Sequence, residues 1–351
     1  MLRALTLKNF KSFRDETIRF SKTGMTVLVG TNGSGKSSVL DAASYATFSF
    51  QPALPALPGA ELVRAGADGF ELELSGEFED GTAGCEVVFR KSRLVAKWFE
   101  RAGVRQYTWD AIQRRNRPNE EPLDDSLIAK LERAFPVPRV LKVSLARLRH
   151  PMRGASTEVV EFEAPQVVQT LFDLKMGTDP NAFNSAMSKV SRVVPALKSF
   201  GIARFSDEND RDAYGLKFNM STGSDIPASQ VSEGTLFAMS VIAATELTAR
   251  PVLLIIDDLD RALHPTAQRE LVRVLREVVK LGRVEVLCTT HSPYILSEFH
   301  YDEVRVLREV DGVSRCQALS DGPDAAKWMK ELDAGEYWSF VEKQMFEKRS
   351  A

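Results

Sequence analysis

The sequence predicts an α/β protein with a mixed, largely parallel core sheet, an antiparallel β subdomain and a helical insertion. Three observations predict this class. The apolar runs at 25–29, 252–257 and 284–290 are typical of strands buried on both faces of a parallel sheet. Residues 70–78 alternate apolar with polar side chains, as strands with one solvated face do. From about residue 124 the apolar residues recur at a helical period.

The individual elements follow from the same patterns. Strands are predicted at 4–10, 17–20, 25–29, 70–78, 85–90, 94–99, 106–109, 139–144, 252–257 and 284–290. Helices are predicted at 38–47, 126–135, 165–176, 181–200, 235–247 and 265–281. We expect a hairpin from 201–205 and 213–220, and a loop at the proline-rich segment 51–59. In the last third buried strands alternate with helices, which places ligands at the carboxyl ends of the strands.

The composition is that of an ordinary folded protein, with 351 residues, 44% of them hydrophobic, and a net charge of -2. This charge excludes a uniformly basic nucleic-acid binder but not a local basic surface. Cys85, Cys288 and Cys316 are too few and too widely spaced to predict a disulfide framework or a zinc site. The sequence has no secretory leader pattern and no apolar run of about 18 residues. We therefore expect a cytoplasmic protein with no membrane contact.

The strongest motif is the segment 30–37, Gly-Thr-Asn-Gly-Ser-Gly-Lys-Ser, which follows a predicted buried strand and precedes a helix. It fits the pattern G-x-x-x-x-G-K-[ST], whose backbone N–H groups surround phosphate oxygens at a helix N-terminus. In such loops the lysine, here Lys36, reaches the β- and γ-phosphates, and the hydroxyl of Ser37 binds Mg²⁺. The predicted nucleotide-binding residues of this loop are Gly30, Asn32, Gly33, Ser34, Gly35, Lys36, Ser37 and Ser38.

Two acids follow the predicted strand 252–257. A hard cation prefers carboxylate oxygen, so we expect Asp257 to hold Mg²⁺, directly or through a water. Asp258 is then placed to orient and deprotonate an attacking water. Acids at strand ends also serve as caps and turn formers, and the phosphate motif upstream is what favours the catalytic interpretation.

Four segments carry a resemblance to a known group: 7–13 (Leu-Lys-Asn-Phe-Lys-Ser-Phe), 232–235 (Ser-Glu-Gly-Thr), 259–265 (Leu-Asp-Arg-Ala-Leu-His-Pro) and 289–293 (Thr-Thr-His-Ser-Pro). Together with the phosphate motif, they resemble the ABC-type ATPase heads of the SMC, RecF and OLD group. The closest similarity is to stand-alone OLD-like bacterial ATPases that lack a coiled coil and a nuclease domain. The tail 335–338 adds a faint match, and the middle of the chain has none.

The resemblance implies a P-loop NTPase fold of the ABC type that binds ATP with Mg²⁺ and hydrolyses the ATP, slowly in this chain. It also implies an ATP-dependent homodimer, in which Ser232 and Gly234 of one subunit close on the γ-phosphate bound by the other. Asp260 would contact the facing subunit, and His291 would hydrogen-bond the γ-phosphate. The catalytic residues implied are Lys36, Asp258 and His291.

Two departures from the group's pattern are visible. ABC heads usually carry glutamate at the position of Asp258, and the shorter aspartate reaches less far toward a water, which favours slow hydrolysis. No glutamine is easily assigned to the loop that precedes the helical lobe. Gln51 lies too close to Lys36, and Arg147 or Arg149 is an alternative.

Four parts of the chain are expected. Residues 1–110 would form the N-terminal part of the ATPase lobe, with the phosphate loop and the antiparallel sheet. Residues 111–225 would form a mainly helical insertion that ends in the hairpin. Residues 226–320 would complete the ATPase lobe, and 321–351 would form a helical tail that docks on the protein's own core.

Charge is concentrated in segment 90–153, which holds sixteen Lys and Arg against seven Asp and Glu, interleaved with aromatic residues. Such a segment fits nucleic acid, although charge runs are usually solvated surface. The chain has no long heptad pattern and no room for an appended nuclease, so we expect a separate effector protein, such as a nuclease or toxin.

Three functions stay open. The first is an ATPase that dimerises around two ATP molecules and switches an effector, for example in bacterial anti-phage defence. The second is a RecF-like clamp that binds DNA for repair or recombination. The third is a nucleotide-gated scaffold with little hydrolysis.

Overall fold

The computed structural model describes residues 1–48, 60–78, 81–90, 93–100, 105–110, 115–116, 136–153, 161–206, 212–246, 251–342 and 345. The predicted loop 51–59 and helix 126–135 lie outside the described residues. Residues 207–211, between the two predicted hairpin strands, and the predicted end of the helix at 247 lie outside them too.

A central sheet organises the molecule. Its strand order is β10 (Glu161–Phe162), β9 (Val137–Leu141), β14 (Val252–Ile256), β15 (Val284–Thr289), β3 (Met25–Gly30), β16 (Val304–Val310) and β17 (Val313–Ala318). Every neighbouring pair is parallel except β16 and β17. The strands β3, β14 and β15 are buried along almost their whole length. The predicted mixed, largely parallel core sheet is therefore confirmed.

A second sheet is antiparallel throughout. Its order is β2 (Phe13–Arg19), β1 (Leu2–Phe10), β4 (Gly69–Phe78), β5 (Gly81–Arg90), β6 (Arg93–Glu100), β7 (Arg105–Asp110) and β8 (Arg115–Asn116). In β4 the exposure alternates between fully buried and half-buried residues up to position 76, as expected for a sheet that packs on one face. The strands predicted at 70–109 are all present, which confirms the antiparallel β subdomain.

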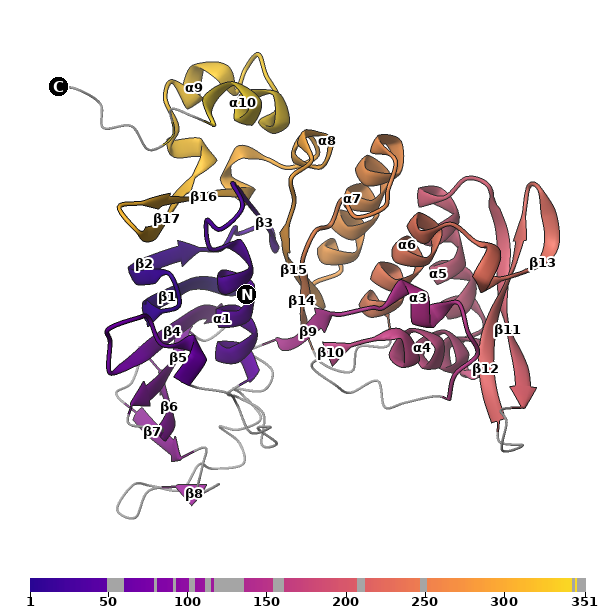
Figure 1. The fold of residues 1–351 in the computed structure, drawn as a ribbon, viewed down its shortest axis with the longest axis horizontal. Helices are drawn as coiled ribbons and strands as arrows, with labels where there is room; N and C mark the ends of the chain where they lie inside the picture. Colours follow the sequence, from indigo (N-terminus) through magenta and orange to yellow (C-terminus); the bar gives the residue numbers. More distant parts are fainter. Residues whose placement is uncertain are drawn as a thin grey trace.

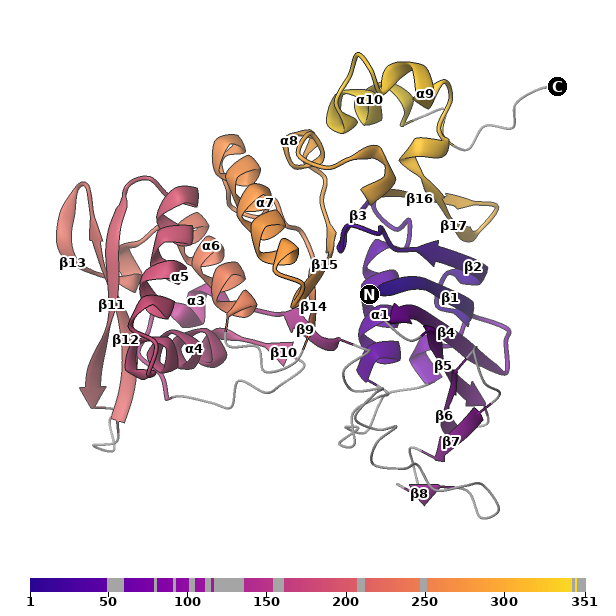
Figure 2. The same ribbon diagram turned by 180° about the vertical axis from the view of Figure 1, so that it is seen from behind.

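The helix α1 (Lys36–Phe48) packs between the two sheets, and both views show it there (Figure 1, Figure 2). Successive residues of β14 face opposite ways, so Leu253 and Ile255 contribute to the α1 side of the central sheet. Leu254 and Ile256 point to the other face, against the remaining helices. The central sheet is thus packed between two apolar cores. These cores hold its strands in place, and with them the carboxyl ends of the strands.

The other face of the central sheet is covered by a helical lobe. Its helices are α3 (Leu145–Leu148), α4 (Ala164–Met176), α5 (Pro180–Val193), α6 (Glu233–Thr245) and α7 (Pro265–Lys280). Every residue of α6 from Thr235 to Thr245 is buried, as expected for a helix with apolar residues on all of its sides. Figure 1 shows α6 enclosed by α3, α4, α5 and α7, and the three-stranded sheet β11–β12–β13 closing the far side.

The predicted helix 181–200 is wrong beyond Val193. There α5 ends, and β11 (Leu197–Ser206) begins four residues later. The cause is Pro195, because the residue before a proline is pushed out of the helical region, and Val194 lies outside that region, with φ -123° and ψ 84°. β11 pairs with β12 (Asp212–Met220), as the predicted hairpin required, and β13 (Gly223–Pro227) extends the sheet.

The predicted strand 139–144 is also shifted. β9 begins at Val137, runs through Pro138 and ends at Leu141, while Ser144 caps α3. Val137 N donates to the carbonyl oxygen of Pro251 at 2.7 Å, on the β14 side, so the nitrogen of Pro138 faces away from β14 and the proline removes no hydrogen bond to that strand. The strand predicted at 17–20 likewise begins earlier, at Phe13.

The C-terminal part packs near the β16–β17 edge of the central sheet. α8 (Pro293–Leu296), α9 (Ala325–Trp328) and α10 (Ala334–Val341) lie together above β16 and β17 (Figure 1). Tyr337 is fully buried and its ring stacks on that of Tyr301, with centroids 5.0 Å apart. The described part of the tail thus packs on the protein's own core, through Tyr337 and Val341. No helix in the described ranges has the length and apolar character needed to cross a bilayer.

A buried ion pair ties α7 to this end of the sheet, and we expect its loss to be costly. Glu303 is fully buried and receives bonds of 2.7 and 2.8 Å from Arg276. Burial would raise the pKa of Glu303, but hydrogen bonds from Arg276 and Thr23 outweigh it and the pKa lies below its ordinary value. Glu303→Gln should lower the free energy of unfolding by about 2–3 kcal/mol, because charge-assisted bonds are lost.

Chemical denaturation measures this cost. The matched control is Glu277→Gln, which breaks a pair with Arg192 on the surface and should cost less than about 1 kcal/mol. Equal effects of the two substitutions would show that the buried pair adds nothing beyond a surface pair.

Candidate functional site

The phosphate motif forms the connection between β3 and α1. Gly30 ends β3 with φ 147°, and a Cβ there would lie 2.1 Å from the carbonyl oxygen of Leu307 on β16. Gly35 has φ 104°, and a Cβ there would meet Ser314 and Phe13 within 3 Å. Both positions therefore require glycine, for backbone conformation and for space. The loop is fixed by strands from the opposite end of the chain.

Lys36 is the first residue of α1, and its side chain folds back over the loop. Its Nζ donates to the carbonyl oxygens of Gly30 at 2.9 Å and Thr31 at 3.1 Å. Burial lowers the pKa of Lys36, while the carboxylates of Asp257 and Asp258 act in the opposite direction. The ammonium thus lies at the centre of the loop, close to both acids that the sequence singled out.

The hydroxyl of Ser34 is a second feature of the loop. It is buried and has no hydrogen-bond partner in the described part of the chain. A buried hydroxyl without a partner is costly unless a ligand supplies one. Ser34 does not line the cavity described below, so this hydroxyl is not evidence for a bound phosphate.

Asp257 follows β14 directly and lies beside α1. Its Oδ2 accepts a hydrogen bond from the Ser37 hydroxyl at 3.1 Å, and its Oδ1 accepts one from Thr289 at 2.5 Å. The pair of a hydroxyl and a carboxylate oxygen is the donor set that Mg²⁺ takes beside nucleotide phosphates. No cluster of three or more His, Cys, Asp or Glu able to hold a metal occurs in the described residues, so phosphate oxygens and waters would complete the coordination. The two residues fit the metal ion that the sequence predicted.

Asp258 lies at the mouth of the same site in an unusual backbone conformation. Its φ is 54°, in the left-handed region that residues other than glycine seldom adopt. Burial raises the pKa of Asp258, the negative charges of Asp257 and Asp260 raise it further, and His291 and Lys36 counteract them. A carboxylate with a raised pKa in a polar cavity is typical of a general base.

One cavity of about 550 Å³ gathers these groups. It lies where the carboxyl ends of β3, β14 and β15 meet, as the topology predicts for a parallel sheet. Its lining residues are Lys11, Ser12, Asn32, Gly33, Gly35, Lys36, Ser37, Ser38, Asp257, Asp258 and His291. Gly30 and Ser34, also predicted as binding residues, lie in the loop but do not line the cavity.

Lys11 and Ser12 were not predicted as site residues. They form the turn between β1 and β2, where Lys11 has φ 48° and its Nζ pairs with Asp41 of α1 at 2.5 Å. The backbone carbonyl of Ser12 accepts from Ser314 N and from Arg64, which holds the turn against the phosphate loop. The segment 7–13 was noted only as a strand motif, and its Lys-Ser pair was the available signal.

The loop after Asp258 is bonded to the end of β15. Asp260 Oδ1 accepts hydrogen bonds from the Thr290 hydroxyl at 2.6 Å and from the His291 backbone N–H at 3.2 Å. The side chain expected to contact a facing subunit is thus engaged within its own chain. His291 itself is exposed and lines the cavity, and His264 caps α7 by accepting from Thr266 N.

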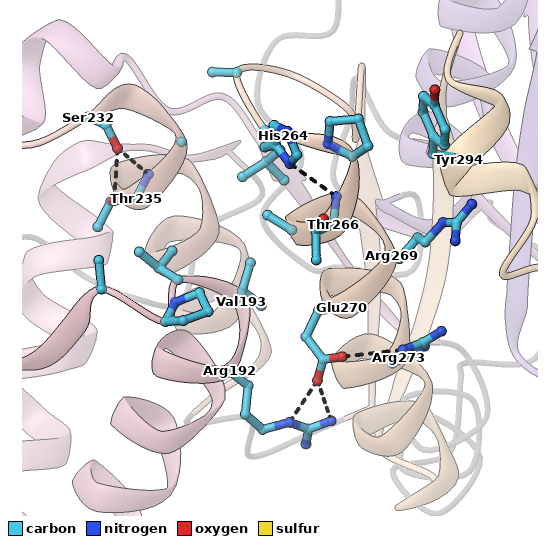
Figure 3. A pocket seen from close by; sticks show the side chains of 18 residues that line it. Arg192, Val193, Ser232, Thr235, His264, Thr266, Arg269, Glu270, Arg273 and Tyr294 are labelled. Carbon is cyan, nitrogen blue, oxygen red and sulfur yellow. Dashed lines mark hydrogen bonds and ion pairs between the residues drawn. The ribbon is translucent and has the colours of Figure 1, made fainter.

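Ser232 and Gly234 lie elsewhere. Ser232 is the N-cap of α6 and accepts from Thr235 N at 3.3 Å, as the motif predicted. Gly234 packs against the backbone of Ala262, where a Cβ would come within 2.5 Å of the carbonyl oxygen. Both line a separate cavity of about 810 Å³ between α5 and α7 (Figure 3). The structure therefore does not bring them into the phosphate cavity of their own chain.

The segment proposed for the glutamine loop is only partly described. Gln51 lies outside the described residues. Arg149 donates to the carbonyl oxygen of Ser229 at 2.7 Å, just before the α6 cap, and neither Arg147 nor Arg149 lines the phosphate cavity. For the basic segment 90–153, most side chains lie outside the described residues.

Comparison with known families agrees with this geometry. The family described as "AAA domain, putative AbiEii toxin, Type IV TA system" matches residues 25–297, which is more than half of the chain. The chain belongs to this AAA family. A second model, described as an AAA ATPase domain, matches residues 1–45. The phosphate loop lies in both matched ranges, and the two acids and His291 lie in the larger one.

This AAA-family chain is similar over part of its length to two kinds of curated protein. The DNA double-strand break repair Rad50 ATPase of Archaeoglobus fulgidus is 40% identical over 75 residues, 21% of this chain and 8% of the relative. The chromosome partition protein Smc of Rhodopirellula baltica is 57% identical over 42 residues, 12% of this chain and 4% of the relative. The matched parts thus cover less than a tenth of these relatives' length.

Solved structures show the same fold. The SMC head bound to the C-winged helix domain of ScpA aligns with a TM-score of 0.57 at 18% identity, covering 90% of this chain and 97% of that one. An Smc head with an extended coiled coil, bound to the C-terminal domain of ScpA derived from Pyrococcus furiosus, gives 0.57 at 16% identity and covers 94% and 98%. The predicted ABC-type ATPase head is confirmed as to fold, and the finer OLD-like resemblance stays a prediction.

Proposed function

We propose that this chain binds ATP with Mg²⁺ in the 550 Å³ cavity and hydrolyses it. The observation that carries the proposal is the convergence of Lys36, Ser37, Asp257, Asp258 and His291 on that cavity from three separate segments of the chain. The phosphate loop supplies backbone N–H groups, and the Lys36 ammonium neutralises the β- and γ-phosphates. Membership of an AAA family supports this nucleotide.

The proposed roles follow from the geometry. Ser37 and Asp257 would hold Mg²⁺, which neutralises phosphate charge in the reaction when it is bound. Asp258 would orient a water and take its proton, since its raised pKa improves it as a base. His291, exposed at the end of β15, would donate to the γ-phosphate. Because Asp258 is one methylene shorter than glutamate, we expect slow turnover.

We further propose that two copies of the chain close head-to-head around two ATP molecules. Each copy has its phosphate cavity and its Ser232–Gly234 helix end on different surfaces. A helix N-terminus favours a phosphate, yet the one at Ser232 meets none in its own chain. Supply of this helix end by a second copy would complete the site.

A sizing measurement tests the dimer. With ATP and Mg²⁺, Asp258→Asn is expected to run at about twice the monomer mass of 39.1 kDa, and without ATP as a monomer. Hydrolysis-deficient protein is used because turnover would release the dimer. The control Lys36→Ala, which lacks the phosphate contact, should stay monomeric with ATP. An unchanged mass of Asp258→Asn at high protein and ATP concentrations would exclude the nucleotide-bridged dimer.

The output of the cycle is proposed to be the switching of a partner protein, such as a nuclease or toxin, in bacterial defence. The family description, which names a toxin and a type IV toxin–antitoxin system, supports this context. The two SMC heads described above were solved with a domain of ScpA, which supports a protein partner in general. The RecF-like DNA clamp would need the basic segment 90–153 to bind DNA. The scaffold with little hydrolysis would be favoured if a measurement of ATP turnover found almost none.

A further inference from the structure

Thr289 ends β15 directly beside the two acids. Its side chain is fully buried. Its hydroxyl lies 2.5 Å from Asp257 Oδ1 and 2.8 Å from the backbone nitrogen of Asp258. One hydroxyl therefore contacts the side chain of one acid and the main chain of the next.

The direction of both bonds is fixed by chemistry. The Asp258 N–H can only donate, so the Thr289 oxygen accepts from it. A hydroxyl has a single proton, and here that proton goes to the carboxylate of Asp257. With Oδ1 engaged by Thr289, Asp257 presents Oδ2 to Ser37, at 3.1 Å. Thr289 thus determines which carboxylate oxygen faces the proposed metal position.

The same residue also brackets Asp258. Its hydroxyl receives the Asp258 N–H, and its carbonyl oxygen receives the Leu259 N–H at 2.9 Å. Asp258 lies between these two bonds in the left-handed conformation, with φ 54°. Such a conformation costs free energy and persists where the surroundings hold it. Thr289 is therefore placed to keep the carboxylate of Asp258 directed at the phosphate cavity.

We propose that Thr289 is a positioning residue of the ATPase site, which orients the Mg²⁺-binding oxygen of Asp257 and holds the backbone of Asp258. This inference rests on the proposed ATP site. It assigns Thr289 no contact with nucleotide, so binding of ATP through the phosphate loop alone should not depend on it.

The test uses three full-length variants. Thr289→Val keeps the shape and removes the hydroxyl, and Thr289→Ser keeps the hydroxyl and removes the methyl group. Thr26→Val is the matched control: Thr26 is also buried, lies on the neighbouring strand β3 and accepts from Ser21 N at 2.9 Å, away from the acids. If Thr289→Val does not fold, Thr289→Ala takes its place. Thermal unfolding without nucleotide establishes that each variant is folded.

The first readout is the ratio of two dissociation constants, the Kd of ATP in EDTA over the Kd of ATP with Mg²⁺. This ratio is the gain in ATP affinity that Mg²⁺ provides. We expect Thr289→Val to reduce this Mg²⁺-dependent gain by about 10- to 100-fold, the effect of losing a hydrogen bond to a charged group, with an unchanged Kd in EDTA. The second readout is kcat, which should fall by a similar factor. Thr289→Ser should restore both to within about threefold, and Thr26→Val should leave both unchanged.

Each result decides between the two proposals. If wild type does not bind ATP, the proposed function fails and Thr289 loses its role with it. If wild type binds ATP with a Mg²⁺-dependent gain and Thr289→Val equals it, only the positioning role fails. Equal losses in Thr289→Val and Thr26→Val, or no rescue by Thr289→Ser, would also overturn that role.

Discussion

Asp258→Asn is expected to lower kcat for ATP hydrolysis by about 10²- to 10⁴-fold, the usual contribution of a general base. Asparagine keeps the size of the side chain and tolerates the left-handed backbone at this position. It removes the charge that would take a proton from water. ATP affinity should be retained or increased, because one negative charge near the phosphates is lost. Phosphate release at saturating ATP, together with a nucleotide-binding titration, measures both quantities.

The control for this substitution is Asp225→Asn. Asp225 also has a left-handed backbone, with φ 57°, but it lies in β13 on the far side of the helical lobe (Figure 1). Asp225→Asn should leave kcat unchanged. It therefore controls for any general effect of replacing an aspartate that has a left-handed backbone. Retention of more than a fifth of wild-type kcat by Asp258→Asn would rule out Asp258 as the base.

Lys36→Ala is expected to weaken ATP binding by about 10²- to 10⁴-fold. A lysine between two phosphates makes two charge-assisted hydrogen bonds, each worth about 1.5–3 kcal/mol. In the structure the same ammonium donates to the carbonyl oxygens of Gly30 and Thr31, so its loss also removes two hydrogen bonds that hold the loop. Isothermal titration with ATP and Mg²⁺ measures the affinity.

Two comparisons separate these effects. Lys280→Ala changes an exposed lysine at the end of α7 and should bind ATP as wild type does. The thermal unfolding temperature without nucleotide should differ little between Lys36→Ala and wild type if the hydrogen bonds of Lys36 to the loop stabilise only the loop. An ATP affinity within threefold of wild type for Lys36→Ala would contradict the assignment of this loop to phosphate.

The sequence predicted those parts of the site whose chemistry is local. The segment 30–37 sets its own backbone conformation through its glycines and lies between a buried strand and a helix, so its role is visible without tertiary contacts. Asp257 and Asp258 could be paired with it because parallel strands end at a common edge. The residues that support these groups could not be predicted in this way.

Thr289, Lys11 and Ser12 illustrate the limit. Each acts through a neighbour that is distant in sequence, and a threonine at the end of a β-strand has no composition signal of its own. The hairpin β16–β17 was also missed, although its Asp311–Gly312 turn is a typical hairpin signal. The helix–strand boundary at Val194 was predicted wrongly because the helical period was given more weight than Pro195.

The position of β3 in the central sheet has a consequence for how the chain folds. β3 is complete at residue 30, yet its two neighbours are β15 and β16, which end at residues 289 and 310. During synthesis the antiparallel pair β1–β2 can form at once, whereas both edges of β3 wait for most of the chain. Pairings between such distant segments are slow because a long loop must close first. The nascent protein therefore carries a finished phosphate motif long before it has a site that can use it.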